Sequence, residues 1–498
     1  MIAASMNGTC ETKRRGVDKI ALLGLFIVAV LAAHFIVVWR SSIVLSEPIE
    51  LDCAGLSVSI PSGNGWRSEK QWKYEQNGFT LSSFFDSGSG EVTALVSCRY
   101  LLSATQATLD VLFKEKVSEA GGVIAKTGQI EAGKPGFSFA KGSQNGTLLT
   151  VDWAHIKRPE TLFDMFFGVA QLPNNRRLDI EVSQATGDID LTEGIFKSVT
   201  ESLKFTDNQL LEAGSKIISE IKSKGLDSFL APAGNEQGQG REGFFLIKEA
   251  GGRTIGFAME VLGSHFSEMP QNGSAIEPAP EAQLNILAGS FYYIRRRYDR
   301  EQATFFQSDN NLDEFVWKSE SSSLIGRSGT EMVLSKDGIM TVKKFDMPRR
   351  FASQNRSGGE EKDYQIGPAA IPDVLGELVF SQMLDSDRKE IFVDIIEADG
   401  RITPALVSRT EAEDSVVTGE EAGYVFRVEF LDGRGFSEQV YLDGQRRISK
   451  ILLQQENTYT LERTSAENIL REFPEQGSYI LQKKDKILEQ KQLQENSG

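Results

Sequence analysis

Few residues of this sequence have the types and spacing that chemistry requires. It contains three cysteines and three histidines in 498 residues, with no CxxC or HExxH pair, so a zinc site with nitrogen and sulfur ligands is not expected. No G-x-S-x-G motif marks a nucleophilic serine, and scattered carboxylates alone identify no general acid or base. The sequence therefore predicts no catalytic residue, metal site or cofactor, and it favours a binding protein over an enzyme.

Two segments come close to ligand-binding motifs but lack a required residue. The first, residues 128–135, fits G-x4-G-K but ends in Pro135, which has no hydroxyl for Mg²⁺ and no amide N–H for phosphate, so a strand and turn are expected. The second, residues 309–320, resembles an EF-hand loop. It has Glu314 at the position where an EF-hand needs glycine for its sharp bend, so an acidic hairpin loop is expected instead. Its acidic and amide residues occupy EF-hand positions 1, 3, 5 and 12: Asp309, Asn311, Asp313 and Glu320.

A long apolar segment near the amino end is typical of a transmembrane helix. Residues 20–39 contain no charged side chain, and about 20 residues at 1.5 Å each match a hydrocarbon core of roughly 30 Å. Basic residues at positions 13–19 precede it, so the positive-inside rule predicts a cytoplasmic tail, residues 1–19, and an exported remainder, periplasmic or extracellular. A cleaved signal peptide is the alternative, but its apolar region is shorter and small residues follow it.

Charge and cysteine content limit the partners and bonds of the exported part. The net charge is −16, and a surface this acidic repels phosphate backbones, so nucleic acid is not an expected partner. Cys53 and Cys98 are predicted to lie outside the cytoplasm, where disulfides persist. One interpretation is a disulfide between them; the other is two separate buried thiols.

The chain beyond residue 40 is longer than one hydrophobic core normally supports, so at least two domains are expected. Residues 50–206 read as an α/β unit with strands at 56–60, 91–100, 162–169 and 177–182. A helix with a capping box at Ser103 and Gln106 is predicted to stop at Gly121. A second amphipathic helix is predicted from about Asp190 to Phe205.

Three features of this unit carry a family resemblance: Ile60-Pro61 at a strand end, Trp66 after it, and the terminal phrase at residues 195–205. With its mid-chain helix, the segment resembles the PsbP-like family of α/β/α sandwiches. The resemblance implies an accessory, assembly or binding module. It implies no catalytic residue, because that family shares no catalytic motif. Trp66 and Trp72 are interpreted as core or cover residues rather than a ligand platform.

The remaining chain divides into a connector, a β domain and a tail. Residues 207–240 are interpreted as a helical connector and linker, and residues 476–498 as a charged tail. Residues 241–475 are predicted to form a predominantly antiparallel β domain, in which segments 269–282 and 349–368 are loops. A helix is expected at Pro372–Leu384. Four Asp-Gly dipeptides between β-rich runs predict hairpins, at residues 337–338, 399–400, 432–433 and 443–444.

Alternation in one strand of the β domain suggests an apolar binding face, formed by Tyr424, Phe426, Val428 and Phe430. The β domain resembles LolA-like domains and other β domains of the bacterial envelope, and this resemblance implies a lipid or lipoprotein ligand. The alternative is that the helix at Pro372–Leu384 closes the sheet as an ordinary core.

The expected fold is therefore α+β, with a single transmembrane helix, a PsbP-like α/β/α sandwich and an antiparallel β domain. The expected function is a non-enzymatic binding or assembly module of the cell envelope, with an envelope protein or a lipid-like ligand as partner. A lipid or lipoprotein carrier is one alternative. A hydrolase whose residues come together from distant positions is the other.

Overall fold

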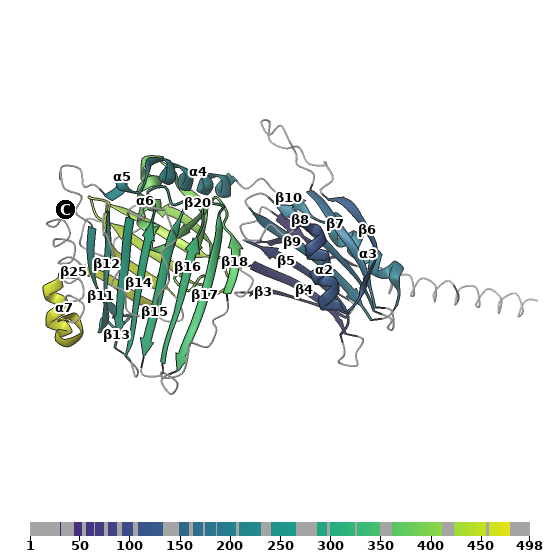
Figure 1. The fold of residues 1–498 in the computed structure, drawn as a ribbon, viewed down its shortest axis with the longest axis horizontal. Helices are drawn as coiled ribbons and strands as arrows, with labels where there is room; N and C mark the ends of the chain where they lie inside the picture. The colour runs from purple at the N-terminus through teal and green to yellow at the C-terminus, as the bar shows by residue number, and fades with distance from the viewer. Residues whose placement is uncertain are drawn as a thin grey trace, which may run out of the picture.

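The computed structural model is mostly β, with large antiparallel sheets and a few helices (Figure 1). Among the described residues no helix is both long and apolar enough to cross a membrane. The predicted transmembrane segment lies outside those residues, except for Val30, which is helical and exposed. The structure describes Val30 and residues 44–51, 56–63, 65–73, 78–86, 92–102, 108–132, 149–158, 163–172, 175–185, 187–205, 209–230, 241–264, 286–295, 299–323, 326–348, 361–410, 423–454 and 458–478.

The first domain contains two antiparallel sheets. Their strands are β1 (Ile49–Leu51), β2 (Leu56–Val58), β3 (Trp66–Lys73), β4 (Gly78–Asp86), β5 (Val92–Leu101), β6 (Val123–Ala132), β7 (Leu149–Lys157), β8 (Asp164–Leu172), β9 (Arg176–Gln184) and β10 (Lys204–Phe205). Seven strands form the larger sheet, in the order β3-β4-β5-β9-β8-β7-β6, while β1 and β10 flank β2 in the smaller one. The predicted strands at 56–60, 91–100, 162–169 and 177–182 are confirmed as β2, β5, β8 and β9.

Helices α2 (Leu109–Ala120) and α3 (Ile189–Glu201) cover opposite faces of the larger sheet. Successive residues of a strand point to opposite faces. In β8, Phe167 therefore packs on Phe113 of α2, with ring centroids 6.2 Å apart, while Phe166 packs on Phe196 of α3 at 5.6 Å. The larger sheet of this domain is thus the middle of three layers, helix, sheet and helix.

Both helices differ from the prediction at one end. Helix α2 begins at Leu109, with Thr108 at its N-cap and no side-chain cap. The predicted capping box, Ser103 and Gln106, lies outside the described residues. Its stop is confirmed, because Gly121 takes a left-handed φ of 62°. Helix α3 ends at Glu201 rather than at Phe205, because residues 204 and 205 leave it to pair with β2.

The second domain is one sheet of fifteen described strands, in the order β18-β17-β16-β15-β14-β13-β12-β11-β25-β24-β23-β22-β21-β20-β19. Neighbouring strands are antiparallel except β19 and β20. The strands are β11 (Arg241–Glu249), β12 (Thr254–Ser264), β13 (Ile286–Ile294), β14 (Arg300–Ser308), β15 (Phe315–Ser323), β16 (Gly326–Leu334), β17 (Ile339–Pro348), β18 (Glu361–Gln365), β19 (Ala370–Pro372), β20 (Glu390–Ile396), β21 (Ile402–Thr410), β22 (Tyr424–Phe430), β23 (Ser437–Leu442), β24 (Ile448–Gln454) and β25 (Thr458–Thr464).

The four predicted Asp-Gly turns are confirmed, since each lies between two paired strands. Gly338, Gly400 and Gly433 have φ values of 77°, 81° and 80°, which glycine adopts without a steric cost. The loop predicted at 349–368 is wrong in part, because residues 361–365 pair with β17 as β18. The other predicted loop, 269–282, lies outside the described residues.

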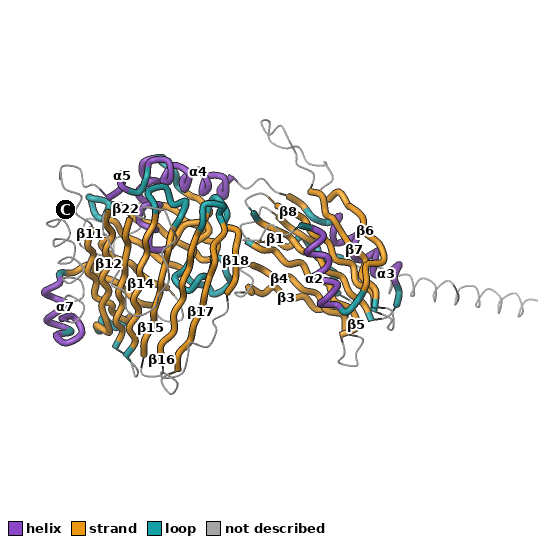
Figure 2. The backbone as a smooth tube through the Cα atoms, viewed as in Figure 1, coloured by secondary structure: helices purple, strands orange, loops and turns teal. Residues whose placement is uncertain are grey.

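Helices lie together across one end of the second sheet (Figure 2). The helix predicted at Pro372–Leu384 is present as η3 (Asp373–Leu375) and α6 (Gly376–Asp385). Helix α4 (Gln209–Lys224), followed by α5 (Asp227–Leu230), was expected in a connector. Instead, α4 packs on β20 so tightly that a Cβ on Gly214 would lie 1.7 Å from the carbonyl oxygen of Phe392.

Helix α7 (Ala466–Glu472) lies apart from these helices (Figure 1). It precedes Phe473, which packs on Phe257 of β12.

A buried ion pair joins the two domains. The Arg176 guanidinium at the β8–β9 turn donates to both oxygens of Asp394 on β20 at 2.8 Å, and to the hydroxyl of Tyr100 at 2.6 Å. Arg176 and Asp394 are 3% and 2% exposed, so the pair is shielded from solvent. Next to it, the Asn175 side-chain amide donates to the carbonyl of Ile366 at 3.0 Å. The end of the first domain that carries this turn therefore faces the second domain.

Candidate functional site

The second sheet curls strongly. Elements at one side of its concave face therefore touch strands at the other side of that face. In the β20–β21 turn, a Cβ on Gly400 would lie 2.5 Å from Cγ1 of Val342 on β17. Element η3, which follows β19 at the sheet edge, contacts β13 near the middle of the strand order. Side chains on the inner face of distant strands therefore converge.

Three carboxylic side chains interact electrostatically in this interior: Glu260 of β12, Asp373 of η3 and Glu438 of β23. Burial raises the pKa of Glu260 to about 7, although a hydrogen bond from the Tyr292 hydroxyl at 3.1 Å opposes the shift. Burial also raises the pKa of Glu438 to about 7, and the nearby carboxylates Glu397 and Glu260 add to the shift. Strands β12 and β23 are four strand spacings apart, roughly 19 Å along the sheet. Glu260 and Glu438 therefore interact across the curled interior.

Asp373 completes this group, which we call the carboxylate cluster (Glu260, Asp373 and Glu438). Burial raises the pKa of Asp373 well above its usual value, and repulsion from Glu397 and Glu438 raises it further. By solvent accessibility, however, Asp373 is exposed, and Glu260 and Glu438 are half-buried. Solvent therefore reaches the cluster, and the interior is not fully packed there.

Arg463 partly opposes the rise in the pKa of Glu260, and the arginines beside Glu397 are engaged with that carboxylate. Glu397, in the β20–β21 turn, accepts a hydrogen bond at 2.8 Å from Arg401 and another at 2.8 Å from Arg434. Among the described residues neither Asp373 nor Glu438 forms an ion pair. Since no opposite charge neutralises them, these carboxyls hold their protons more strongly than exposed ones do.

Apolar side chains line the same face beside the carboxylate cluster. Those of Phe245, Ile247 and Leu461 are buried, on strands β11 and β25. Others nearby are only half-buried: Tyr292, Ile451, Leu453 and Tyr459. This side of the interior therefore combines apolar contact surface with groups that donate or accept hydrogen bonds.

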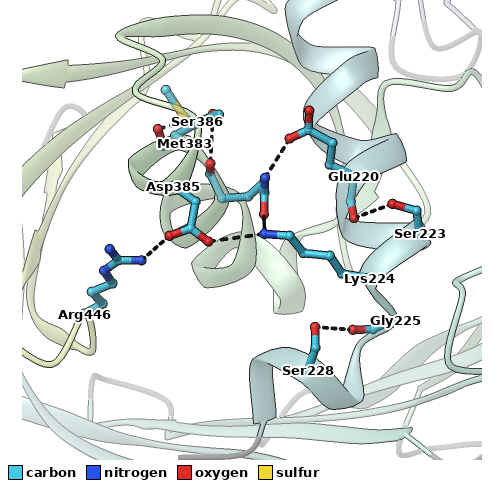
Figure 3. A network of polar contacts seen from close by, with 10 residues as sticks. Glu220, Ser223, Lys224, Gly225, Ser228, Met383, Asp385, Ser386 and Arg446 are labelled. Carbon is cyan, nitrogen blue, oxygen red and sulfur yellow. Dashed lines mark hydrogen bonds and ion pairs between the residues drawn. The ribbon is translucent and has the colours of Figure 1, made fainter. Parts of the chain in front are cut away.

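A polar network fastens the helices at the far end of α6 (Figure 3). Lys224 of α4 donates to the side-chain carbonyl of Gln382 at 2.6 Å and reaches Asp385 at 3.3 Å. Arg446, in the β23–β24 turn, donates to Asp385 at 2.6 Å. The pKa of Asp385 is lowered, first by the hydrogen bond from Arg446 and then by that from Lys224. The network links α4, α6 and the β23–β24 turn at this end of α6.

The predicted apolar face lies on the strand where it was expected, but α6 covers its centre. Phe426 is fully buried, and its ring stacks on Phe380 of α6 at 4.9 Å. Val428 is also buried, Phe430 is half-buried and stacks on Phe436, and Tyr424 is exposed. The structure therefore places helix α6 where the hypothesis placed a ligand, at least over Phe426.

The other singled-out residues take structural positions. The Cys98 thiol is free and buried, and burial raises its pKa to about 12; Cys53 lies outside the described residues, so the disulfide stays a prediction. Asp309 accepts hydrogen bonds from the amides of Asp313 and Glu314 in the β14–β15 turn. Within the described residues no cluster of His, Cys, Asp and Glu could hold a metal ion.

Sequence reasoning missed the carboxylate cluster, although one of its members left a signal. In β12, Ala258, Glu260 and Leu262 share the inner face with apolar residues on both sides. A single acid in the apolar half of an alternating strand is unusual. Asp373 and Glu438 stand in segments where acidic residues are ordinary, so no comparable signal marks them.

No family model matches the chain, and a search of curated proteins found no match. One solved structure with which it shares a likeness is a beta-barrel-like protein of domain of unknown function DUF1849 from Brucella abortus. The likeness has a TM-score of 0.30 and 8% identity, and it covers 46% of this chain and 98% of the other. At this level it assigns no function.

Proposed function

We propose that the protein is a membrane-anchored, extracytoplasmic binding module whose second domain takes an amphipathic ligand on the inner face of its curled sheet. The observation that supports this most directly is the convergence of Glu260, Asp373 and Glu438 beside half-buried apolar side chains. Burying carboxyls without opposite charges costs stability. Groups of this kind concentrate where a ligand or substrate makes use of them.

The chemistry of the interior indicates the ligand class. A protonated carboxyl donates a hydrogen bond, while an ionised one accepts bonds from an ammonium group. Tyr459 and Leu453 offer apolar contact close by. A ligand with an amine or hydroxyl head group and an apolar body fits both features, and a membrane anchor would hold the domain where such molecules are abundant.

Ligand binding is tested by titrating the purified whole chain with a dansyl-labelled long-chain alkylamine and, in parallel, with the matching fatty acid. We expect saturable binding of the amine, weakened by Glu260→Gln and by Glu438→Gln in folded protein. Glu320→Gln is the matched control, because Glu320 is exposed and pairs with Arg327 on the same domain. If neither probe binds saturably, the proposal fails. Saturation by the fatty acid alone would exclude the amine head group.

Membrane anchoring is tested separately. The full chain should remain with membranes after alkaline carbonate washing, because a span of 20 apolar residues does not depend on charge. Protease added outside intact spheroplasts should digest nearly all of the chain. Release by carbonate would contradict the anchor and leave the ligand site untouched.

Hydrolysis is the second candidate function, and the pKa of about 7 at Glu260 and Glu438 favours it. A carboxyl with that pKa is suited to general acid catalysis near neutral pH. The two functions separate in one comparison, in which a chromogenic glycoside and ester panel is assayed with the natural chain and with Glu438→Gln. Turnover that Glu438→Gln abolishes supports the enzyme, whereas saturable probe binding without turnover supports the binding module.

A further inference from the structure

Exposed apolar side chains gather at one end of the first domain. Val92 begins β5, Val123 and Ile124 begin β6, Ile189 begins α3, and Val44 precedes β1. Their exposed fractions lie between 41% and 56%. Elsewhere in the described residues of this domain the one large apolar side chain with comparable exposure is Val111, at 43%.

The strand register shows that these positions share one end of the sheet. One row of paired residues crosses the sheet at this end, from strand to neighbouring strand: Val123, Lys157, Asp164, Gln184 and Ala94. This row runs from the start of β6 to the start of β5, close to Val92. Ile189 follows directly after β9, at the same end. Val44 belongs there too, because its carbonyl accepts from the Ser62 amide at 2.8 Å, just before β3 begins.

This end points away from the second domain. The Arg176 ion pair lies at the opposite end of the same sheet, where β8 ends and β9 begins. In Figure 1 the second domain lies to the left of the first, and α3 lies at its far right. The exposed apolar side chains are therefore not covered by the rest of the described chain.

We propose that this end of the first domain docks on the surface of the lipid bilayer, a step that rests on the proposed membrane anchor. The predicted span ends at Trp39, only five residues before Val44, and five extended residues reach at most about 18 Å. The tether is therefore long enough to cross the head-group region, roughly 7 Å deep, and reaches at most about 11 Å beyond it. It holds this end of the domain at the membrane surface.

The spread of the side chains fits a flat surface such as a bilayer. From β5 to β6 they extend over four strand spacings, roughly 19 Å, so a flat surface meets them together, whereas a single pocket does not. Trp66 and Phe85, half-buried with ring centroids 5.4 Å apart, lie at the same end, and tryptophan favours membrane interfaces. Asp188 and Asp190 lie there together with Lys157, so this end carries both signs of charge and the attraction is apolar rather than electrostatic.

The test uses the full chain reconstituted in vesicles of radiolabelled phosphatidylcholine, with the photo-crosslinker p-benzoylphenylalanine at one position. At Val92, Val123 or Ile189 we expect severalfold more lipid attached to the protein after irradiation than at Val111. Val111 is the matched control, because it is the same residue type, similarly exposed, near the start of α2 at the opposite end. Equal lipid labelling at Val111 and the other sites would overturn the proposal.

Charge substitution provides a second measurement. With the crosslinker at Ile189, Val92→Asp combined with Val123→Asp should lower lipid labelling severalfold, while Val111→Asp should leave it unchanged. Crosslinks to protein instead of lipid in native membranes would show that a partner covers this end, which contradicts the proposal. Carbonate extraction of the same samples separates the causes. Protein that is released has lost the anchor, whereas protein that is retained without lipid labelling is anchored but not docked.

Discussion

The domain junction and the interior of the second sheet both bury ionisable groups, but they treat them in opposite ways. At the junction, Arg176 meets Asp394 in a bidentate pair, and Tyr100 accepts a further hydrogen bond. In the interior, Glu260 and Glu438 face other carboxylates, and their pKa values rise to about 7. The first arrangement neutralises a buried charge with an opposite one, which suits a structural joint. The second is left uncompensated, which suits a binding site.

Breaking the junction pair should have the largest effect. Arg176→Met leaves Asp394 buried without its cation, which we expect to cost about 3–5 kcal/mol in the free energy of unfolding. Urea unfolding followed by tryptophan fluorescence measures it. The double variant Arg176→Met/Asp394→Leu should recover most of the loss, because it removes both charges. A single variant as stable as the natural chain would show that the pair does not hold the junction.

The carboxylate cluster should make stability depend on pH in the opposite direction to a paired acid. Since the pKa of Glu260 and Glu438 is raised in the folded state, the folded protein binds more protons than the unfolded chain between about pH 4.5 and 7. Stability should therefore be fully present below this range and fall as pH rises through it. At pH 8, Glu260→Gln should raise stability by at most about 3 kcal/mol, less where solvent reaches the carboxyl.

Thermal unfolding from pH 4 to pH 8 checks this dependence. Glu320→Gln serves as the control, and it should leave the slope between pH 4.5 and 7 unchanged. A natural chain whose melting temperature rises through this window would contradict the uncompensated cluster.

Pushing the β20–β21 turn away from β17 should disturb the interior but spare the junction. Gly400→Ala brings a Cβ to 2.5 Å from Val342 and strains a φ of 81°, while Gly433→Ala has the same strain, at 80°, with nothing within 4 Å. We expect both to destabilise the protein and Gly400→Ala to cost about 1–3 kcal/mol more, because of the overpacking. Chemical denaturation of the pair measures the difference. Equal losses would mean that the turn does not pack on β17.

The surface network at α6 should matter least. Asp385→Asn weakens its bonds to Arg446 and Lys224, but these groups are well exposed, so we expect a loss below about 1 kcal/mol. Because the pKa of Asp385 is lowered, the contribution is present at neutral pH and disappears as pH falls through that lowered pKa. Asp363→Asn, in the edge strand β18, is a surface control. A loss as large as that of Arg176→Met would rank the network with the junction.

Local signals made much of the fold predictable. The Asp-Gly turns at 337–338, 399–400, 432–433 and 443–444 need only two residues and their backbone preferences, and Gly121 ended α2 by the same logic. Predictions failed where distant partners decided the outcome. Residues 204 and 205 left α3 to pair with β2, and residues 361–365 formed a strand because β17 was available to pair.

The sequence by itself determined the alternation of strands, the positions of turns and helices, and the acidic charge, because each depends on neighbours within a few residues. Only the tertiary structure brought Glu260, Asp373 and Glu438 together, joined Arg176 to Asp394 across 218 residues of sequence, and placed Phe380 over Phe426. The physical reason is the curl and long-range packing of the sheet. Whether a buried charge meets an opposite or a like charge depends on which distant strands face each other, and no local pattern encodes that choice.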